Sequence, residues 1–158
     1  MKGNPDILSA LNQGLAIELT ASSTYASLAA ILDNAGFKNL ASYFEAEAKE
    51  EAEHRDKVLE RIAFLEGSPQ LQFLPAGQKA IDDANNIPML MNSVLAMEKS
   101  SAQHYNQLVS VCVVSDESGT RDLAAEMVRV SEDGVNWAEE QLGLIKTLGL
   151  QLYLNAQI

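Results

Sequence analysis

The stretch from Lys38 to Glu66, KNLASYFEAEAKEEAEHRDKVLERIAFLE, decides the fold of this chain. Its core-facing positions recur at alternating steps of mostly three and four residues, which is the period of a long bundle helix. They are Leu40, Phe44, Glu47, Glu51, His54, Val58, Ile62 and Leu65. Glu51 and His54 therefore stand in the middle of an apolar stripe. An ionisable side chain there costs several kcal/mol unless a partner or a metal ion compensates it.

Two further stretches repeat this arrangement. One helix is expected from about Pro5 or Asp6 to the Asn34-Ala35-Gly36 stop signal, and another from Ile87 and Pro88 to just before Ser115. Each has an acidic residue near the midpoint of its stripe, Glu18 in the first and Glu98 in the second. The stripes read Leu11, Leu15, Glu18, Ser22, Tyr25, Ala29 and Leu32, and Met91, Val94, Glu98, Ser101, Tyr105, Val109 and Cys112.

A fourth helix, expected from about Thr120 to Thr147, breaks the pattern. Its stripe is Ala124, Val128, Ser131, Val135, Ala138, Leu142 and Ile145, with no ionisable residue. In the segment equivalent to Glu51 and His54 it offers Ser131 and Gly134. Four buried ionisable residues on three helices predict a metal site inside a four-helix bundle, and the fourth helix leaves that site incomplete on one side.

The connections complete the predicted topology. Residues 67–86 show no clear helical period and contain Pro69, Pro75 and Gly77, so they read as a long crossover that makes the second and third helices parallel. The tail from Leu150 to Ile158 is expected to form a short fifth helix. The fold class is therefore all-α, with one domain over residues 1–158.

Composition limits the classes of function. The net charge of −11 and the pI near 4.5 argue against nucleic acid as a partner, because phosphate binding needs a basic patch. No uninterrupted apolar run of 18 residues appears, so no membrane span is expected. The segment MKGNPDILSA does not resemble a secretory signal, and the single Cys112 cannot form an internal disulfide. A cytoplasmic location follows as the expectation.

The ionisable residues suggest the chemistry of the site. Residues three apart share a helix face, so Glu51 and His54 can bind one ion, and a mixed set of oxygen and nitrogen ligands suits iron, manganese or zinc. Alternatives stay open: Glu98 on the surface, His54 as a core histidine without metal, and Glu47, Glu50 and Glu53 as a solvated face. Tyr25 and Tyr105 are core aromatics on the simpler interpretation. A buried phenol could also hydrogen-bond to a ligating carboxylate.

The chain resembles the bacterioferritins, the haem-associated branch of the ferritin family, over essentially its whole length. The most specific matches are the opening MKG, the block ERIAFLEG at residues 60–67, the region of Trp137, and the ending LGLQLYLNAQI at residues 148–158. The resemblance implies an up-down-down-up four-helix bundle with a short C-terminal helix. It also implies a hollow shell of 24 subunits that stores ferric mineral, an intrasubunit dinuclear centre that oxidises ferrous iron, and haem at two-fold interfaces.

The same resemblance assigns roles to individual residues. Glu18 and His54 match ligands of one iron, Glu51 a bridging carboxylate, and Glu98 the terminal carboxylate of the second iron. The family's second Glu-x-x-His falls at Ser131 and Gly134, so one bridge and one imidazole are missing. Glu132 is adjacent, but a shift of one residue turns a side chain by about 100° around the helix, and only a local bulge could bring it in. The family's axial haem methionine falls at Ala52, which has no ligating atom.

The sequence therefore predicts a bacterioferritin-like iron-storage subunit with a degenerate ferroxidase centre. It is expected to bind one iron per subunit rather than two, to lack haem as a homo-oligomer, and to oxidise iron weakly if at all. A shell shared with a second, competent subunit type would explain how such a site persists. The alternatives are an active ferroxidase with a reduced or rearranged metal site, and a structural cage protein without iron chemistry.

Overall fold

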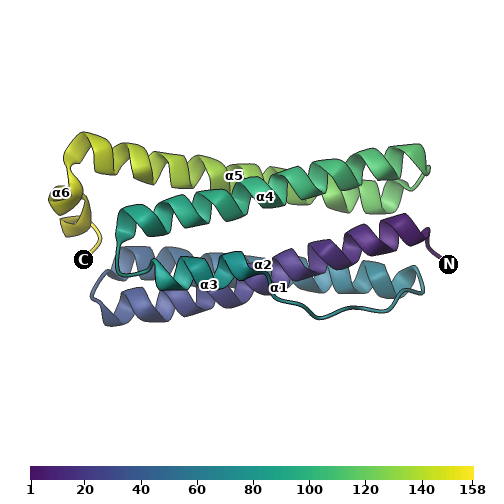
Figure 1. Cartoon of the computed structure of the whole chain (residues 1–158), viewed down its shortest axis with the longest axis horizontal. Coiled ribbons are helices and arrows are strands. Elements are labelled where there is room, and N and C mark those ends of the chain that lie inside the picture. The colour runs from purple at the N-terminus through teal and green to yellow at the C-terminus, as the bar shows by residue number, and fades with distance from the viewer.

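The computed structural model describes residues 1–158, and its only regular secondary-structure elements are helices. Four long helices form the bundle: α1 (Pro5–Asn34), α2 (Lys38–Phe64), α4 (Ile87–Val114) and α5 (Ser118–Leu148). Helices α1 and α2 form one antiparallel pair, and α4 and α5 form the other (Figure 1). The crossover that connects α2 to α4 returns along the length of the bundle, so these two helices run in the same direction. The predicted up-down-down-up topology is thereby confirmed.

The helix ends follow local sequence signals. Asn4 caps α1 by accepting a hydrogen bond from the Asp6 amide, and Pro5 occupies the first turn, where a missing N–H costs nothing. Asn86 caps α4 in the same manner, accepting from the Met89 amide. Helix α2 ends at Phe64, two residues earlier than expected, because Glu66 adopts a left-handed backbone with φ of 57°.

The crossover contains a helix that the sequence did not predict. Residues 75–82 form α3 (Pro75–Asp82), so the expectation of an unstructured crossover was wrong there. Eight residues are too few for a helical period to stand out, and only Gly77 and Ala80 are buried. Helix α3 packs beside α1 and α4. Its contact with α1 is close: a Cβ atom added at Gly77 would lie 2.5 Å from the Thr24 hydroxyl.

The short α6 (Leu150–Asn155) lies within the tail expected to form a fifth helix and folds across one end of the bundle (Figure 1). Gly149 allows the turn before it by adopting a φ of 79°, a left-handed conformation that glycine tolerates. Tyr153 is buried and donates a hydrogen bond to Gln141 of α5. The amide of Asn39 at the start of α2 donates to the Gln157 carbonyl, so the tail is attached to both helix pairs.

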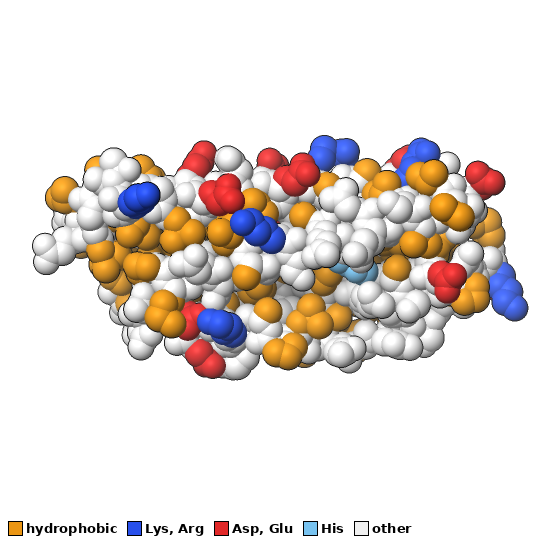
Figure 2. All heavy atoms as spheres, turned by 45° about the horizontal axis from the view of Figure 1, so that its top comes forward, with side chains coloured by type: hydrophobic (Ala, Val, Ile, Leu, Met, Phe, Trp, Pro, Cys, Tyr) orange, Lys and Arg blue, Asp and Glu red, His pale blue; other side chains and the backbone are white.

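The surface agrees with the acidic composition. On the face shown in Figure 2, the Lys and Arg side chains stand singly or in pairs with acidic neighbours, without a basic patch. Helix α1 contains an 18-residue window of mean hydropathy 1.4, long and apolar enough by composition to cross a membrane. Some 56% of that window is buried inside the bundle, as a core helix requires.

Candidate metal centre

The core of the bundle is divided along its length into two apolar clusters. One includes Tyr25, Phe44 and Met91, and the other includes Leu11, Ile62 and Leu108. Between them lies a layer of buried polar side chains contributed by all four long helices: Glu18 from α1, Glu51 and His54 from α2, Glu98 and Ser101 from α4, and Ser131 from α5. Buried polar groups need partners, so the contacts within this layer decide what it can bind.

Three of these residues gather into one group. Glu18, Glu51 and His54 each offer one ligand atom, and these atoms all lie within 4.8 Å of one another. Nδ1 of His54 lies 3.1 Å from Oε2 of Glu51, the contact expected for residues three apart on one helix face. The structure thus brings together three of the four residues predicted as metal ligands.

Glu18 leaves one oxygen free in this group. The hydroxyl of Tyr105 on α4 donates a hydrogen bond of 2.5 Å to Oε1. Oε2 is the one buried side-chain nitrogen or oxygen in the chain that has no hydrogen-bond partner. An unsatisfied buried oxygen costs roughly 1–3 kcal/mol, which a bound cation would offset. A free carboxylate oxygen beside a second carboxylate and an imidazole is the donor set that a divalent iron, manganese or zinc ion prefers, so these residues fit a metal ion.

Glu98 is buried as the stripe predicted, but it lies outside this group. The Tyr25 hydroxyl on α1 donates a short hydrogen bond to its Oε1. Its carboxyl group also covers Gly134 of α5, where an added Cβ would lie 2.6 Å from the Glu98 Cδ. The Glu98 side chain therefore occupies the space that a residue larger than glycine would need at position 134.

Helix α5 contributes no ionisable group to the site. Ser131 is buried, and its hydroxyl lies 2.8 Å from the hydroxyl of Ser101 on α4. Glu132 is exposed, and α5 runs as a regular helix through this region without the bulge that would turn Glu132 inward. The position expected to hold a second bridging carboxylate is thus filled by a pair of serines.

Burial and neighbouring charges set the protonation of the layer. Burial, and then the charge of Glu51, raises the pKa of Glu18 well above its ordinary value. The same two causes raise the pKa of Glu98 to about 8. Burial also pushes the pKa of Glu51 upward, but its contacts with His54 and Glu18 together outweigh burial and lower the pKa. Burial lowers the pKa of His54, but the hydrogen bond and the charge of Glu51 raise it by more, so the net shift is upward. Burial therefore favours the neutral form of the Glu18 and Glu98 carboxyls, whereas the Glu51–His54 contact favours the carboxylate and the protonated imidazole.

Comparison with known proteins identifies the family of this chain. The ferritin-like domain family matches residues 8–148. A protein named bacterial ferritin from Pseudomonas aeruginosa is 31% identical over 159 residues, covering 100% of both chains. The chain belongs to the ferritin family. A bacterial ferritin of Synechocystis is also 31% identical, covering 100% of this chain and 99% of its own. A bacterioferritin of Mycolicibacterium paratuberculosis is 30% identical, covering 97% and 94%.

Ferritin-family proteins bind iron and form homo-oligomeric cages. In this chain the position expected for a haem methionine is Ala52. Ala52 is half-buried beside a surface groove between α1 and α2. Small side chains line most of it: Ser22, Ser23, Ala26, Ala29, Ala48 and Ala52, with Glu45, Lys49 and Arg55. No sulfur atom lies among them.

The acidic residues beside this candidate site are of two kinds. Glu50 and Glu53 are exposed, as a solvated face requires, but Glu47 is half-buried. Burial, together with the charges of Glu50 and Glu51, raises the pKa of Glu47 to about 7.

Sequence reasoning missed the pairing of the two tyrosines. It anticipated that a buried phenol could bond to a ligating carboxylate but did not say which tyrosine would meet which glutamate, and the hydrogen bonds cross between helices. Tyr105 of α4 binds Glu18 of α1, and Tyr25 of α1 binds Glu98 of α4. A signal for this was present: Glu18 and Tyr25, like Glu98 and Tyr105, are seven residues apart, which places each glutamate two turns from a tyrosine on the same face.

Proposed function

We propose that this chain is an iron-storage subunit of the bacterioferritin type whose centre holds one metal ion, bound by Glu18, Glu51 and His54. The observation that carries the proposal is the free Oε2 of Glu18, which lies in one group with Glu51 and His54. Oε1 of Glu98 is held by Tyr25 and Glu98 lies outside this group, and Ser131 and Gly134 supply neither a carboxylate nor an imidazole. A second ion would retain Glu98 and a shared Glu51 only.

The residues would act on ferrous iron as their substrate. The pKa values of Glu18 and His54 are both raised, and a cation binds only the carboxylate and the neutral imidazole, so binding should release protons. Tyr105 would hold one oxygen of Glu18 and leave the other directed toward Glu51 and His54. Pairwise oxidation of ferrous ions requires two ions within bridging distance. A site for one ion should therefore oxidise iron slowly, which makes the homo-oligomer a weak ferroxidase.

Calorimetric titration with zinc tests the proposal directly. Zinc has no redox chemistry and accepts the same oxygen and nitrogen donors. One tight site per subunit, accompanied by proton release, is the expected result. Two tight and equivalent sites would refute the degenerate centre and favour an active ferroxidase, whereas no tight site would favour a structural cage without iron chemistry.

Two assembly features belong to the same proposal. A shell of 24 subunits shared with a competent second subunit would supply the oxidation that this chain lacks. Ala52 offers no axial ligand, so the homo-oligomer should contain no stoichiometric haem. Purification with haem available, followed by a visible spectrum, tests the second point. A Soret band at one haem per subunit pair would contradict it.

A further inference from the structure

Helix α1 contains a glycine in its interior, one turn before Glu18. Gly14 is buried, and a glycine at such a position makes a helix less stable than an alanine would. The space that a side chain would need is taken by Tyr105 of α4. A Cβ atom added at Gly14 would lie 3.0 Å from the hydroxyl oxygen of Tyr105 and 3.2 Å from its ring carbon Cε1. Position 14 therefore has no room for a side chain while Tyr105 keeps its place.

Tyr105 is held against α1 by its neighbours. Its hydroxyl donates a hydrogen bond of 2.5 Å to Oε1 of Glu18 and lies 3.4 Å from the Gly14 carbonyl oxygen. Its ring is 1% exposed and packs edge-on against the imidazole of His104, with centroids 5.2 Å apart. Nε2 of His104 in turn donates a hydrogen bond of 3.0 Å to the Ala10 carbonyl. Three successive turns of α1, at residues 10, 14 and 18, thus contact two consecutive residues of α4.

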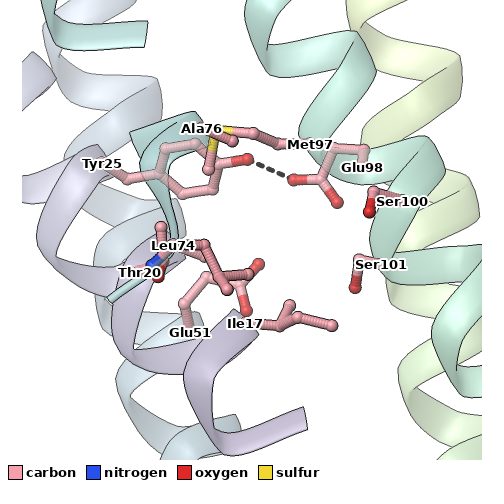
Figure 3. A pocket seen from close by; sticks show the side chains of 11 residues that line it. Ile17, Thr20, Tyr25, Glu51, Leu74, Ala76, Met97, Glu98, Ser100 and Ser101 are labelled. Carbon is pink, nitrogen blue, oxygen red and sulfur yellow. Dashed lines mark hydrogen bonds between the residues drawn. The ribbon is translucent and has the colours of Figure 1, made fainter. Parts of the chain in front are cut away.

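The other tyrosine of the polar layer reaches its glutamate without such a glycine. Figure 3 shows the hydroxyl of Tyr25 directed at the carboxyl of Glu98, to which it donates a hydrogen bond. The residue one turn before Glu98 is Val94, which is buried and has a full side chain. A tyrosine–glutamate pair therefore does not require a glycine at this position. The glycine accompanies the pair whose glutamate, Glu18, has a free buried oxygen in the metal group.

Gly14 and Glu18 lie on the same helix, and this connects the packing of the phenol to the metal group. A Cβ atom at position 14 would push the phenol away from α1 by a few tenths of an ångström. The hydrogen bond to Glu18 would then lengthen, or the carboxyl would follow the phenol. Either change moves Oε2 of Glu18 relative to Glu51 and His54, which belong to α2. Metal–ligand distances stay within about 0.2 Å of their usual values, so a shift of this size affects binding.

We propose that Gly14 is a positioning residue of the candidate metal centre. Its missing side chain lets the Tyr105 phenol lie against α1 and hold Oε1 of Glu18. Oε2 then stays in place beside Glu51 and His54. The inference rests on the proposed one-ion centre. It assigns a function in metal binding to a glycine that contributes no ligand atom and that lowers the stability of its own helix.

Calorimetric titration of Gly14→Ala with zinc tests this function. The parent protein should bind one zinc per subunit, and failure of that step would reject the one-ion centre itself. Gly14→Ala should keep this stoichiometry and weaken the affinity about tenfold, as when an outer partner of a metal ligand is disturbed. The control is Gly143→Ala in α5, where an added Cβ meets nothing within 4 Å. It should raise the melting temperature and leave the zinc affinity unchanged. Unchanged zinc affinity in Gly14→Ala would overturn the proposal.

A double-mutant cycle separates positioning from a general loss of packing. Tyr105→Phe removes the atom that lies nearest to the added Cβ at position 14. In that background Gly14→Ala should change the zinc affinity by less than about twofold, because the phenol through which it acts is already gone. It should also lower the melting temperature of the metal-free protein less than it does in the parent. A double variant that binds zinc about tenfold more weakly than Tyr105→Phe alone would show that Gly14 does not act through the phenol and would overturn the proposal.

Discussion

The two helix pairs of the bundle share a buried glutamate and a tyrosine on one helix but differ in what the other helix contributes to the polar layer. In α1 and in α4 a buried glutamate and a tyrosine seven residues later exchange hydrogen bonds across the bundle. In α2 a glutamate and a histidine stand opposite them, whereas α5 has Ser131 and Gly134 at the corresponding depth. The difference shows that a tyrosine can hold a buried carboxyl at one oxygen and still leave the other oxygen free for a metal ion. Each glutamate accepts one phenol hydrogen bond, but only the second oxygen of Glu18 is fully buried, without a partner and grouped with Glu51 and His54.

The largest expected difference is between variants in which Glu18 or Glu98 is replaced by a neutral glutamine. Glu18→Gln removes a ligand and should weaken zinc binding by about 100-fold, since even outer partners of metal ligands contribute 10–100-fold. Glu98→Gln keeps the shape of the side chain, and Glu98 bonds to Tyr25 rather than to a residue of the metal group, so the zinc affinity should change little. Calorimetry on the two variants measures both. Equal losses would mean that Glu98 moves into the centre when metal binds.

Giving α5 the glutamate and histidine that α2 has tests whether the missing ligands account for the difference between the two helix pairs. The double variant Ser131→Glu and Gly134→His should raise the stoichiometry from one zinc to two per subunit and speed ferrous oxidation. The structure adds a condition: an added Cβ at position 134 would lie 2.6 Å from Cδ of Glu98, so Glu98 must leave Tyr25 and turn toward the new ligands. Loss of the Glu98–Tyr25 contact should therefore accompany the second metal.

Zinc stoichiometry and oxygen consumption after ferrous addition test this double variant. The single variant Gly134→Ala serves as its control, because it displaces Glu98 without adding a ligand and should keep one zinc. A folded double variant that still binds one zinc would show that the missing α5 ligands are not what limits the site.

The metal-free protein should lose stability as the pH rises, and Glu98 should account for part of that loss. Its folded pKa of about 8 lies above the unfolded value near 4.5, because burial disfavours the charged form. The folded state therefore binds more protons between these values, and the free energy of unfolding falls as pH rises through this window. The effect is on the order of 5 kcal/mol. Raised pKa values of Glu18 and His54 act in the same direction.

Thermal unfolding with a chelator present measures this dependence between pH 5 and pH 9. Glu98→Gln remains neutral throughout, so its melting temperature should depend less on pH and should exceed that of the parent protein at pH 9. Asp6 at the exposed N-terminus of α1 provides the matched substitution, Asp6→Asn, which should leave the slope unchanged. A parent protein whose stability rises across this range would contradict the assignment.

The sequence predicted most of the bundle because its signals were local and repeated. Long apolar stripes, Asn caps and Gly or Pro stops fixed the four main helices to within two residues. Helix α3 was missed because eight residues give a stripe of only two buried positions, Gly77 and Ala80. Its formation depends on packing against α1, which no local pattern reveals.

The candidate site was predictable only in part for a similar reason. The stripe positions indicated that Glu18, Glu51, His54 and Glu98 would be buried, and they are. Which of them meet depends on side-chain directions and on partners from other helices. Tyr25 binds Glu98 and Tyr105 binds Glu18, and the partners of these hydrogen bonds are 73 and 87 residues apart in the sequence.

The smallest expected difference lies between those two tyrosines. Tyr105→Phe removes the hydrogen bond that holds Oε1 of Glu18, so the carboxylate loses its fixed orientation, and zinc affinity should fall by about tenfold. Tyr25→Phe frees Glu98 rather than Glu18 and should leave the affinity of the first ion nearly unchanged. Both changes delete one hydroxyl from a fully buried ring, so their packing effects are matched. Competition with a zinc chelator resolves a tenfold difference. A larger loss in Tyr25→Phe than in Tyr105→Phe would show that the ion binds on the Glu98 side of the bundle.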